Sequence, residues 1–407
     1  MMLVERKEYL KKLISWKDEK VIKVITGLRR AGKSTLLKQY QQKLREMNVS
    51  EDQIIYINFE NLNNEELLNY NTLHSYLESK LVKDKMTYIF LDEIQRVENF
   101  QKSVDSIYIK ENTDIYITGS NAYLLSGELA TLLSGRYVEI LILPLSFREY
   151  IELNHETNQP DKAFASYMKY GGLPYISTME KTDDKITLYL DGNYNTVVVK
   201  DIIDREVRKG TRRVTDISLL NTIARYLSSV IGSPVSIKAV TDYITSNGRK
   251  VSLNTIDDYI SALTESYLFY PCQRYDISGK ELLKNNNKFY TVDLGLRNYI
   301  LPKKNYDLGF SIENLVFLEL QRRGWKVNTG KLHNAEVDFV ATKNGDINYF
   351  QVTTDMTQES TFEREMKSLR AIKDNYNKIV LTLDRFTEGI YNGIKVINLI
   401  DWLLGQA

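Results

Sequence analysis

A glycine-bounded segment near the amino terminus has the composition of a phosphate-binding loop. It follows the apolar run 21–26 and consists of Gly27, Leu28, Arg29, Arg30, Ala31, Gly32, Lys33, Ser34 and Thr35. In such a loop, backbone N–H groups turn inward around an anion, and the start of the next helix adds positive potential. Lys33 is placed to reach the β- and γ-phosphates of ATP, and the Ser34 hydroxyl to coordinate Mg²⁺. The segment therefore predicts a P-loop; a glycine turn that binds nothing is the alternative.

Two acids follow a second apolar run. Asp92 and Glu93 come directly after residues 88–91. A buried strand would deliver Asp92 to the magnesium shell, and Glu93 would orient and polarise the attacking water. Because a simple kinase needs no water-activating acid, the pair favours hydrolysis. The alternative is a strand that ends in a solvated acidic turn.

Three further residues are candidates for contact with the γ-phosphate. Ser120 and Asn121 follow the apolar run 114–118, where a polar side chain can lie between the γ-phosphate and the water; a helix cap is the competing interpretation. Arg136 precedes the run 138–143, and an arginine there can act as a finger in its own subunit or in a neighbouring one. A surface ion pair is the alternative for Arg136.

The elements that must position these residues form an α/β fold with a parallel sheet. The apolar runs 21–26, 54–60, 88–92, 114–118 and 138–143 predict its strands, and helical periodicity follows the P-loop. In parallel sheets, ligand chemistry gathers at the carboxyl ends of the strands. The candidate residues before Arg136 follow such ends.

The middle of the chain predicts helices followed by a strand pair. Apolar spacing indicates helices over 147–216 and then at 217–227, 237–244 and 252–263, with strands at 267–275 and 288–292. Three helices and a β-wing are typical of a winged helix. Its third helix exposes acids, and the basic stretch 200–213 has acids interleaved, so a protein contact is favoured over DNA binding.

The carboxyl-terminal part has the layout of a restriction-endonuclease-like domain. Glu313 lies on a predicted helix, Glu336 and Asp338 on a strand, and residues 349–353 form the next strand. Active members carry an acid and a lysine on that last strand. Here Gln351 and Thr353 replace them, so we expect a degenerate domain in which Lys367 is the one candidate for the missing charge.

Composition sets limits on partners and location. The chain has 407 residues and a formal charge of +1, so its net charge does not support nucleic-acid binding, which would need a local patch. No signal peptide or membrane-spanning run is apparent, which predicts a cytoplasmic protein without a membrane partner. The single cysteine, Cys272, has apolar neighbours and predicts a buried, inert thiol.

The chain resembles the bacterial and archaeal AAA-type ATPases that carry a carboxyl-terminal domain of unknown function. The resemblance rests on the P-loop, the pair Asp92 and Glu93, the segment with Ser120 and Asn121, Arg136, and the turn Gly171-Gly172-Leu173-Pro174. The resemblance implies the ATPase chemistry. Together with the periodicity and residue spacing described above, it predicts an ATPase domain over 1–146, a helical lid over 147–215, a winged helix over 216–298 and a degenerate restriction-endonuclease-like domain over 299–407. In such enzymes the lid covers the nucleotide, so the glycine turn is expected near it or serves only as an interhelix turn.

The resulting hypothesis is Mg²⁺-dependent binding and hydrolysis of ATP that controls the conformation of the later domains. Lys33, Glu93, Asn121 and Arg136 are its predicted catalytic residues, and Ser34 and Asp92 its predicted metal ligands. An unknown protein partner and a homo-oligomer are expected. An ATP-gated switch with slow turnover and an ATP-controlled nuclease are the alternatives.

Overall fold

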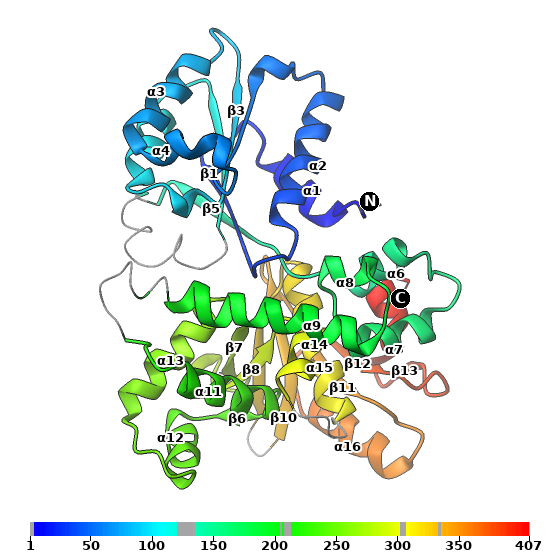
Figure 1. Ribbon diagram of the computed structural model, residues 1–407. Helices are drawn as coiled ribbons and strands as arrows, with labels where there is room; N and C mark the ends of the chain where they lie inside the picture. Colours follow the sequence, from blue (N-terminus) through cyan, green and yellow to red (C-terminus); the bar gives the residue numbers. More distant parts are fainter. Residues whose placement is uncertain are drawn as a thin grey trace. The chain divides into compact units, whose positions relative to one another are not determined.

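The computed structural model describes residues 4–119, 133, 135–203, 206, 213–301, 307–332 and 335–406. The chain divides into two compact units (Figure 1). Unit 1 comprises Met1–Leu143 with Glu265–Tyr267, and unit 2 comprises Pro144–Thr264 with Leu268–Ala407.

In the described part of unit 1, five strands form one parallel sheet in the order β2-β3-β4-β1-β5. The strands are β1 (Ile22–Thr26), β2 (Ile54–Asn58), β3 (Thr87–Asp92), β4 (Thr113–Thr118) and β5 (Tyr137–Leu141). The predicted parallel α/β sheet is thus confirmed. Because all these strands run the same way, their carboxyl ends meet at one edge.

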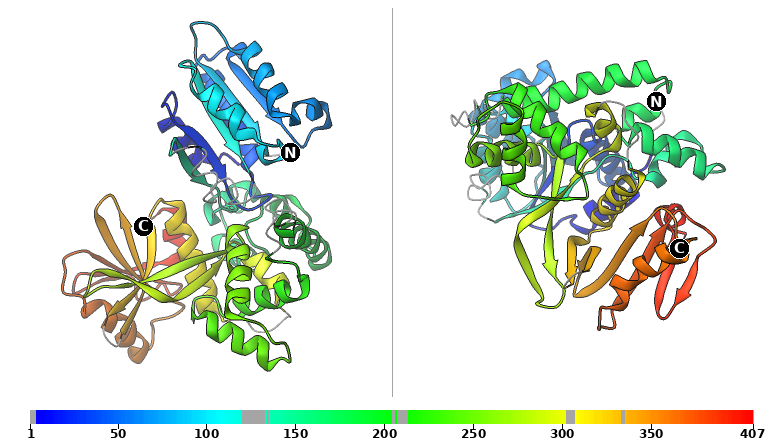
Figure 2. Two further views of the ribbon diagram at one scale, coloured as in Figure 1. Left: turned by 90° about the vertical axis from the view of Figure 1, so that its left-hand side faces the viewer. Right: turned by 90° about the horizontal axis from the view of Figure 1, so that it is seen from below.

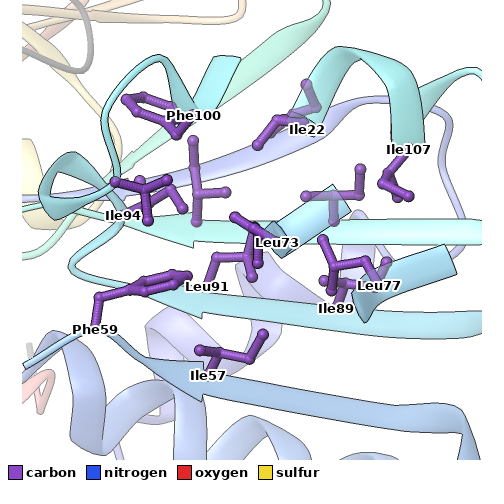
Figure 3. Close-up of a cluster of buried hydrophobic side chains, with 14 of the residues drawn as sticks. Ile22, Ile57, Phe59, Leu73, Leu77, Ile89, Leu91, Ile94, Phe100 and Ile107 are labelled. Carbon is purple, nitrogen blue, oxygen red and sulfur yellow. The ribbon is translucent and has the colours of Figure 1, made fainter. Parts of the chain in front are cut away.

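Helices cover both faces of this sheet. They are α1 (Lys7–Ser15), α2 (Lys33–Glu46), α3 (Tyr70–Lys80) and α4 (Phe100–Tyr108), with short 3-10 turns η1 (Glu51–Gln53), η2 (Leu62–Leu68) and η3 (Ile94–Arg96). Side chains alternate along each strand. One set, which includes Ile22 and Leu91, packs under Leu73 of α3 and Ile107 of α4 (Figure 3). On the opposite face Tyr40 of α2 contacts Phe90 and Tyr116.

Unit 2 begins with short helices, α6 (Phe147–Asn154), α7 (Pro160–Tyr170), α8 (Pro174–Thr178) and α9 (Asp183–Tyr194), then the π-helical turn η5 (Asn195–Asp201). The glycine turn between α7 and α8 is fixed inside this unit. The Gly172 N–H donates to Asp293 Oδ2 at 2.6 Å, and Gly171 has a φ of 78°. A Cβ on Gly171 would lie 2.1 Å from Asp293 Oδ1, so the turn requires glycine there. These contacts favour the interhelix turn among the two predicted roles.

The next elements match the predicted helices and strand pair. They are α11 (Ile217–Ser229), β6 (Pro234–Val235), α12 (Ile237–Ser246), α13 (Leu253–Glu265), β7 (Phe269–Asp276) and β8 (Glu281–Thr291). Asp216, Ser236 and Ser252 cap the helices through side-chain oxygens that accept backbone N–H groups. Cys272 lies buried on β7, and burial raises the pKa of its thiol to about 12, as expected for an inert cysteine.

Among the described residues, nine strands of unit 2 form one sheet in the order β13-β14-β12-β11-β10-β9-β7-β8-β6. The later strands are β9 (Lys326–Leu332), β10 (Ala335–Lys343), β11 (Asp346–Thr353), β12 (Asn377–Thr382), β13 (Gly389–Tyr391) and β14 (Ile394–Asn398). The hairpin β7–β8 does not stand apart, because β7 pairs in parallel with β9 and so continues into the later strands (Figure 2).

The remaining helices are α14 (Leu294–Ile300), α15 (Leu308–Arg322), α16 (Glu359–Arg370) and α17 (Leu399–Leu404). On one face of the sheet, Phe317 of α15 stacks on Tyr290 and lies at a tilt to Phe339. On the other, Met366 of α16 packs into a cluster with Val380. Over the described ranges, none of the helices has the length and apolar character that crossing a bilayer requires.

Candidate functional site: the carboxyl edge of the unit 1 sheet

The predicted P-loop connects β1 directly to α2. Gly27 has a φ of 131° and Gly32 a φ of 102°, a region that favours glycine. A Cβ on Gly27 would lie 2.2 Å from the Ile142 carbonyl oxygen. Because α2 begins at Lys33, the N–H groups of its first turn lie at the end of this loop. The loop therefore has the backbone of an anion-binding site.

Lys33 lies over the loop. Its Nζ donates to the carbonyl oxygens of Gly27 at 3.0 Å and Leu28 at 3.2 Å. Ser34 and Thr35, the next residues of α2, are partly buried. The ammonium and the Ser34 hydroxyl thus belong to the same helix start as the N–H groups of the first turn.

The other predicted loop residues differ in what they present. Leu28 and Ala31 are fully buried, so their side chains belong to the core and only their backbone can face a ligand. Arg29 pairs with Glu60 at 2.9 Å, just beyond β2, and Arg30 has a left-handed φ of 65°. The structure therefore gives the Arg29 guanidinium a protein partner.

Arg6 supports the loop from the amino-terminal segment and was not predicted. It is 3% exposed, and its guanidinium donates to the carbonyl oxygens of Ala31 at 3.1 Å and Leu143 at 2.9 Å. These bonds tie the loop to the segment after β5. The sequence offered no signal, since Arg6 stands among other charged residues.

Asp92 lies at the end of β3 and is held by three neighbours. It is fully buried and accepts hydrogen bonds from Tyr56 Oη at 2.9 Å, Asn58 Nδ2 at 3.2 Å and Thr118 Oγ1 at 2.6 Å. Burial and the charge of Asp92 raise the pKa of Tyr56, so its phenol keeps its proton at neutral pH. The carboxylate is therefore fixed in one orientation by the strands on either side.

Glu93 turns the chain out of β3. Its φ of 58° is unusual for a residue with a side chain, and its backbone N–H donates to Thr118 Oγ1 at 2.9 Å. Gln95 Nε2 donates to Glu93 Oε2 at 2.5 Å. The two predicted acids thus lie together, and Thr118 contacts both residues.

Thr118 is the polar residue at the end of β4 that the sequence analysis missed. Its position as the last residue of an apolar run was the available signal, but attention went to Ser120 and Asn121. Those two residues lie outside the described part of the chain. Their predicted role in catalysis stays a prediction.

Arg136 lies at the other edge of the sheet. It precedes β5, whose first residue Tyr137 is in register with Ile22, whereas the P-loop follows Thr26 at the opposite end of β1. The Arg136 guanidinium lies over the Tyr108 ring, 5.5 Å from its centroid. The structure does not bring Arg136 to the P-loop of its own chain.

Lys367, the candidate for the missing positive charge, does not pair with the acids of unit 2 in the described structure. Lys367 is exposed, while its neighbours Met366 and Ser368 form the buried side of α16. It does not supply the missing charge to Glu313, which instead contacts Lys288. No spacing rule could have indicated this lysine, because it comes from a different strand.

Two family models match this chain. Residues 19–151 match an AAA domain, and residues 161–307 match a domain of unknown function, DUF8612. An uncharacterized protein of Haemophilus influenzae is 40% identical over 406 residues, which cover 99% of each chain. The uncharacterized protein MJ1544 of Methanocaldococcus jannaschii is 32% identical over 387 residues, covering 89% of this chain and 82% of its own.

Among solved structures, the Walker-type ATPase PABY2304 of Pyrococcus abyssi matches with a TM-score of 0.46 and 16% identity. The match covers 73% of this chain and 96% of the Pyrococcus chain. The Aeropyrum pernix ORC1 protein, solved in complex with DNA, matches with a TM-score of 0.32 and 13% identity. That match covers 74% of this chain and 92% of the other.

Proposed function

Because the chain belongs to the same family as the Haemophilus and Methanocaldococcus proteins, with an AAA domain followed by DUF8612, we propose that it binds ATP with Mg²⁺ and hydrolyses it. The observation that carries the proposal is the set of groups at the carboxyl edge of the unit 1 sheet. Lys33 lies at the end of the loop that follows β1, Asp92 ends β3 and Glu93 follows it, with β4 between the two strands. Neighbouring strands lie about 4.8 Å apart, so these ends are about 10 Å from each other.

The residues present fit a magnesium–nucleotide complex. Residues 27–35 would hold the phosphates through backbone N–H groups, with Lys33 on the β- and γ-phosphates. Ser34 and Asp92 would hold Mg²⁺, which when bound neutralises charge on the phosphate oxygens. The hydrogen bonds to Asp92 from Tyr56, Asn58 and Thr118 keep its carboxylate oriented for this.

Glu93 is assigned to the attacking water. It accepts a hydrogen bond from that water and takes up its proton as the oxygen attacks the γ-phosphorus. The bond from the γ-phosphorus to the bridging oxygen breaks, and ADP and phosphate leave. The left-handed turn at Glu93 places this acid just beyond Asp92.

An oligomer would complete the site. Since Arg136 lies at the far edge of its own sheet, its proposed role as a finger is toward the nucleotide of a neighbouring copy. Its place directly before β5 supports this version over action within one chain.

The later domains are assigned as proposed from the sequence. The order α11, β6, α12, α13, β7, β8 supports a winged helix, and α15 followed by β9, β10, β11, α16 and β12 supports a degenerate restriction-endonuclease-like fold. We propose that nucleotide state in unit 1 controls their conformation, with boundaries at 146, 215 and 298.

Substitution of Glu93 and Lys33 tests the proposal. Glu93→Gln is expected to lower ATP turnover about 100-fold or more while ATP binding persists. Lys33→Ala is expected to weaken ATP binding itself. Glu98→Gln and Lys38→Ala, which change exposed side chains nearby, serve as matched controls. Turnover that is unaltered in Glu93→Gln would refute the role of Glu93, and unchanged nucleotide affinity in Lys33→Ala would refute the phosphate site.

A further inference from the structure

A buried lysine of unit 2 lies between carboxylates from two other elements. Lys288, on β8, is 3% exposed. Its Nζ lies 3.1 Å from Glu313 Oε1 of α15 and 2.6 Å from Glu336 Oε1 of β10. Tyr290, on the same face of β8, donates its hydroxyl to the same Glu313 oxygen at 2.6 Å. One ammonium thus connects a hairpin strand, a helix and a second strand.

Asp338 completes this group, which we call the Lys288 cluster (Lys288, Tyr290, Glu313, Glu336 and Asp338). The pairing of β10 with β9 shifts register between Val337 and Val340, so Asp338 lies in a bulge. Its Oδ2 accepts the backbone N–H of Val352 at 2.8 Å. Bulges redirect side chains, and this one accompanies the acid nearest to β11.

The charges of the cluster depend on one another. The five residues that define the cluster carry three carboxyl groups, one ammonium group and one phenol. Burial raises the pKa of Glu313 and, together with the charge of Glu313, raises that of Asp338 well above its usual range. Burial alone would lower the pKa of Lys288, but the charges of Glu313, Asp338 and Glu336 raise it above its ordinary value. The ammonium therefore keeps its charge at neutral pH.

The three acids come from a helix and a strand. In the restriction-endonuclease-like layout that we proposed from the sequence, acids on such elements would hold a divalent ion. We propose that the Lys288 ammonium is the resident cation of the cluster, that it replaces a divalent ion there, and that it fastens the β7–β8 hairpin to α15 and β10. The inference concerns unit 2 alone and does not depend on ATP hydrolysis in unit 1.

Two observations favour this role over a catalytic one. A lysine that steadies an attacking hydroxide must reach water, whereas the Lys288 ammonium is buried against two carboxylates. Within the ranges that the structure describes, no three His, Cys, Asp or Glu side chains lie in an arrangement that could hold a metal ion. The geometry is that of an internal ion cluster with its cation supplied by the chain.

Thermal unfolding of the full, nucleotide-free chain with Mn²⁺ or with a chelator tests the proposal. In the wild-type chain, the unfolding midpoint of unit 2 is expected to be the same with Mn²⁺ and with chelator. Lys288→Met is expected to lower the midpoint by roughly 5–15 °C with chelator, because it leaves the buried Glu313 carboxylate without its counter-charge. Mn²⁺ is expected to restore part of this loss, and the restoration is expected to disappear in Lys288→Met/Asp338→Asn.

Controls separate the cluster from general effects. Lys288→Arg keeps the charge and should show no new response to Mn²⁺, and Lys326→Met changes an exposed lysine of the same sheet. Any binding of Mn²⁺ near Asp92 is common to all variants and cancels in the comparison. If Lys288→Met does not fold, Lys288→Met/Glu313→Gln, which removes one charge of each sign, is expected to regain folding.

Several results would overturn the proposal. Stabilisation of wild type by Mn²⁺ that is lost in Asp338→Asn would show that the cluster already binds a divalent ion. Cleavage of DNA or RNA by wild type with Mn²⁺, lost in Asp338→Ala, would make Lys288 part of a nuclease site. A Lys288→Met variant that is as stable as wild type and does not respond to Mn²⁺ would show that no resident cation is needed. If Lys288→Met does not fold, failure of the added Glu313→Gln change to restore folding would show the same.

Discussion

The Thr118 hydroxyl donates a hydrogen bond of 2.6 Å to Asp92 Oδ1, and Thr118 Oγ1 itself accepts the Glu93 N–H at 2.9 Å. One side chain from β4 therefore contacts the residue proposed to hold Mg²⁺ and the residue proposed to activate water. Since Thr118 ends its strand beside β3, it fixes the relative positions of these two acids. We infer that it positions them and takes no part in bond making.

Substitution of Thr118 by valine tests this positioning role. The change keeps the shape of the side chain but removes both hydrogen bonds, so Asp92 loses one of its partners and the turn at Glu93 loses its anchor. We expect ATP turnover to fall about 10- to 100-fold and the Mg²⁺ concentration for half-maximal activity to rise. Affinity for nucleotide without Mg²⁺ should change little. Steady-state hydrolysis across a magnesium titration measures both effects.

Thr113→Val provides a matched control on the same strand. Thr113 begins β4, and its hydroxyl donates to the carbonyl oxygens of Ile107 and Lys110, away from Asp92. It should lose stability without the magnesium dependence. Equal effects of the two substitutions on magnesium dependence would show that Thr118 acts only through the stability of the strand.

Contiguous motifs were predictable, and contacts between distant segments were not. Residues 27–35 form one short contiguous motif, and Asp92 and Glu93 form another. Such motifs can be recognised from their residue types alone. The contacts of Asp92 with Tyr56 and Thr118 follow from the strand order β2-β3-β4, which must be known before the neighbours can be named. Sequence order alone does not provide it.

The same reason explains the two buried cations that were missed. Arg6 meets Leu143 across 137 positions of sequence. Lys288 meets Glu313 only because β8 and α15 pack together. Sequence spacing indicated Lys367, on the next predicted helix, as the source of the missing charge, but Lys367 is exposed. The parallel pairing of β7 with β9, which joins the hairpin to the later strands, had no sequence signal either.

Arg136 is predicted to act on the nucleotide of a neighbouring copy. Arg136→Ala should lower ATP turnover by about 100-fold or more, because an arginine finger stabilises charge in the transition state, and should leave ATP affinity of the isolated chain intact. Mixing Arg136→Ala with Glu93→Gln should restore part of the turnover. A mixed interface can combine an intact Glu93 from one copy with an intact Arg136 from the other.

Two controls accompany that mixing experiment. Each variant mixed with wild type reports dilution effects, and Tyr108→Leu removes the ring beneath the guanidinium without removing the charge. Turnover in Arg136→Ala equal to that of wild type would leave Arg136 as a surface residue that packs on Tyr108. Loss of turnover without any recovery on mixing would argue against action between copies.

Asp293 is predicted to make the stability of unit 2 depend on pH. Burial raises the pKa of its carboxyl to about 6, although N–H groups of Gly172 and Leu296 donate to it. Because the folded state binds this proton more tightly than the unfolded state, the contribution of Asp293 to stability is highest below about pH 4 and falls as pH rises through about 6. A difference of about 2 pKa units corresponds to about 3 kcal/mol.

Asp293→Asn removes this titration. The amide can accept only one of the two N–H groups that Asp293 accepts on separate oxygens, so the variant carries an offset in stability that is independent of pH. The unfolding temperature of wild type relative to the variant should therefore fall between pH 4 and pH 7. Curves that stay parallel over this range would show that Asp293 does not titrate as described.

Two glycines of unit 2 are predicted to respond in opposite directions to alanine. A Cβ on Gly295 would lie 2.1 Å from the Tyr170 carbonyl oxygen, so the backbone must move, and Gly295→Ala should destabilise the protein by about 2 kcal/mol or more. Gly192 lies exposed within α9, and apart from its chain neighbours and the backbone of its own helix, no described atom lies within 4 Å of an added Cβ. Gly192→Ala should stabilise by about 0.5–1 kcal/mol, because alanine has less backbone freedom to lose in a helix.

Chemical denaturation of both variants beside wild type measures the two changes, with each serving as the control for the other. A stable Gly295→Ala would mean that α14 does not approach the end of α7 as closely as the structure shows.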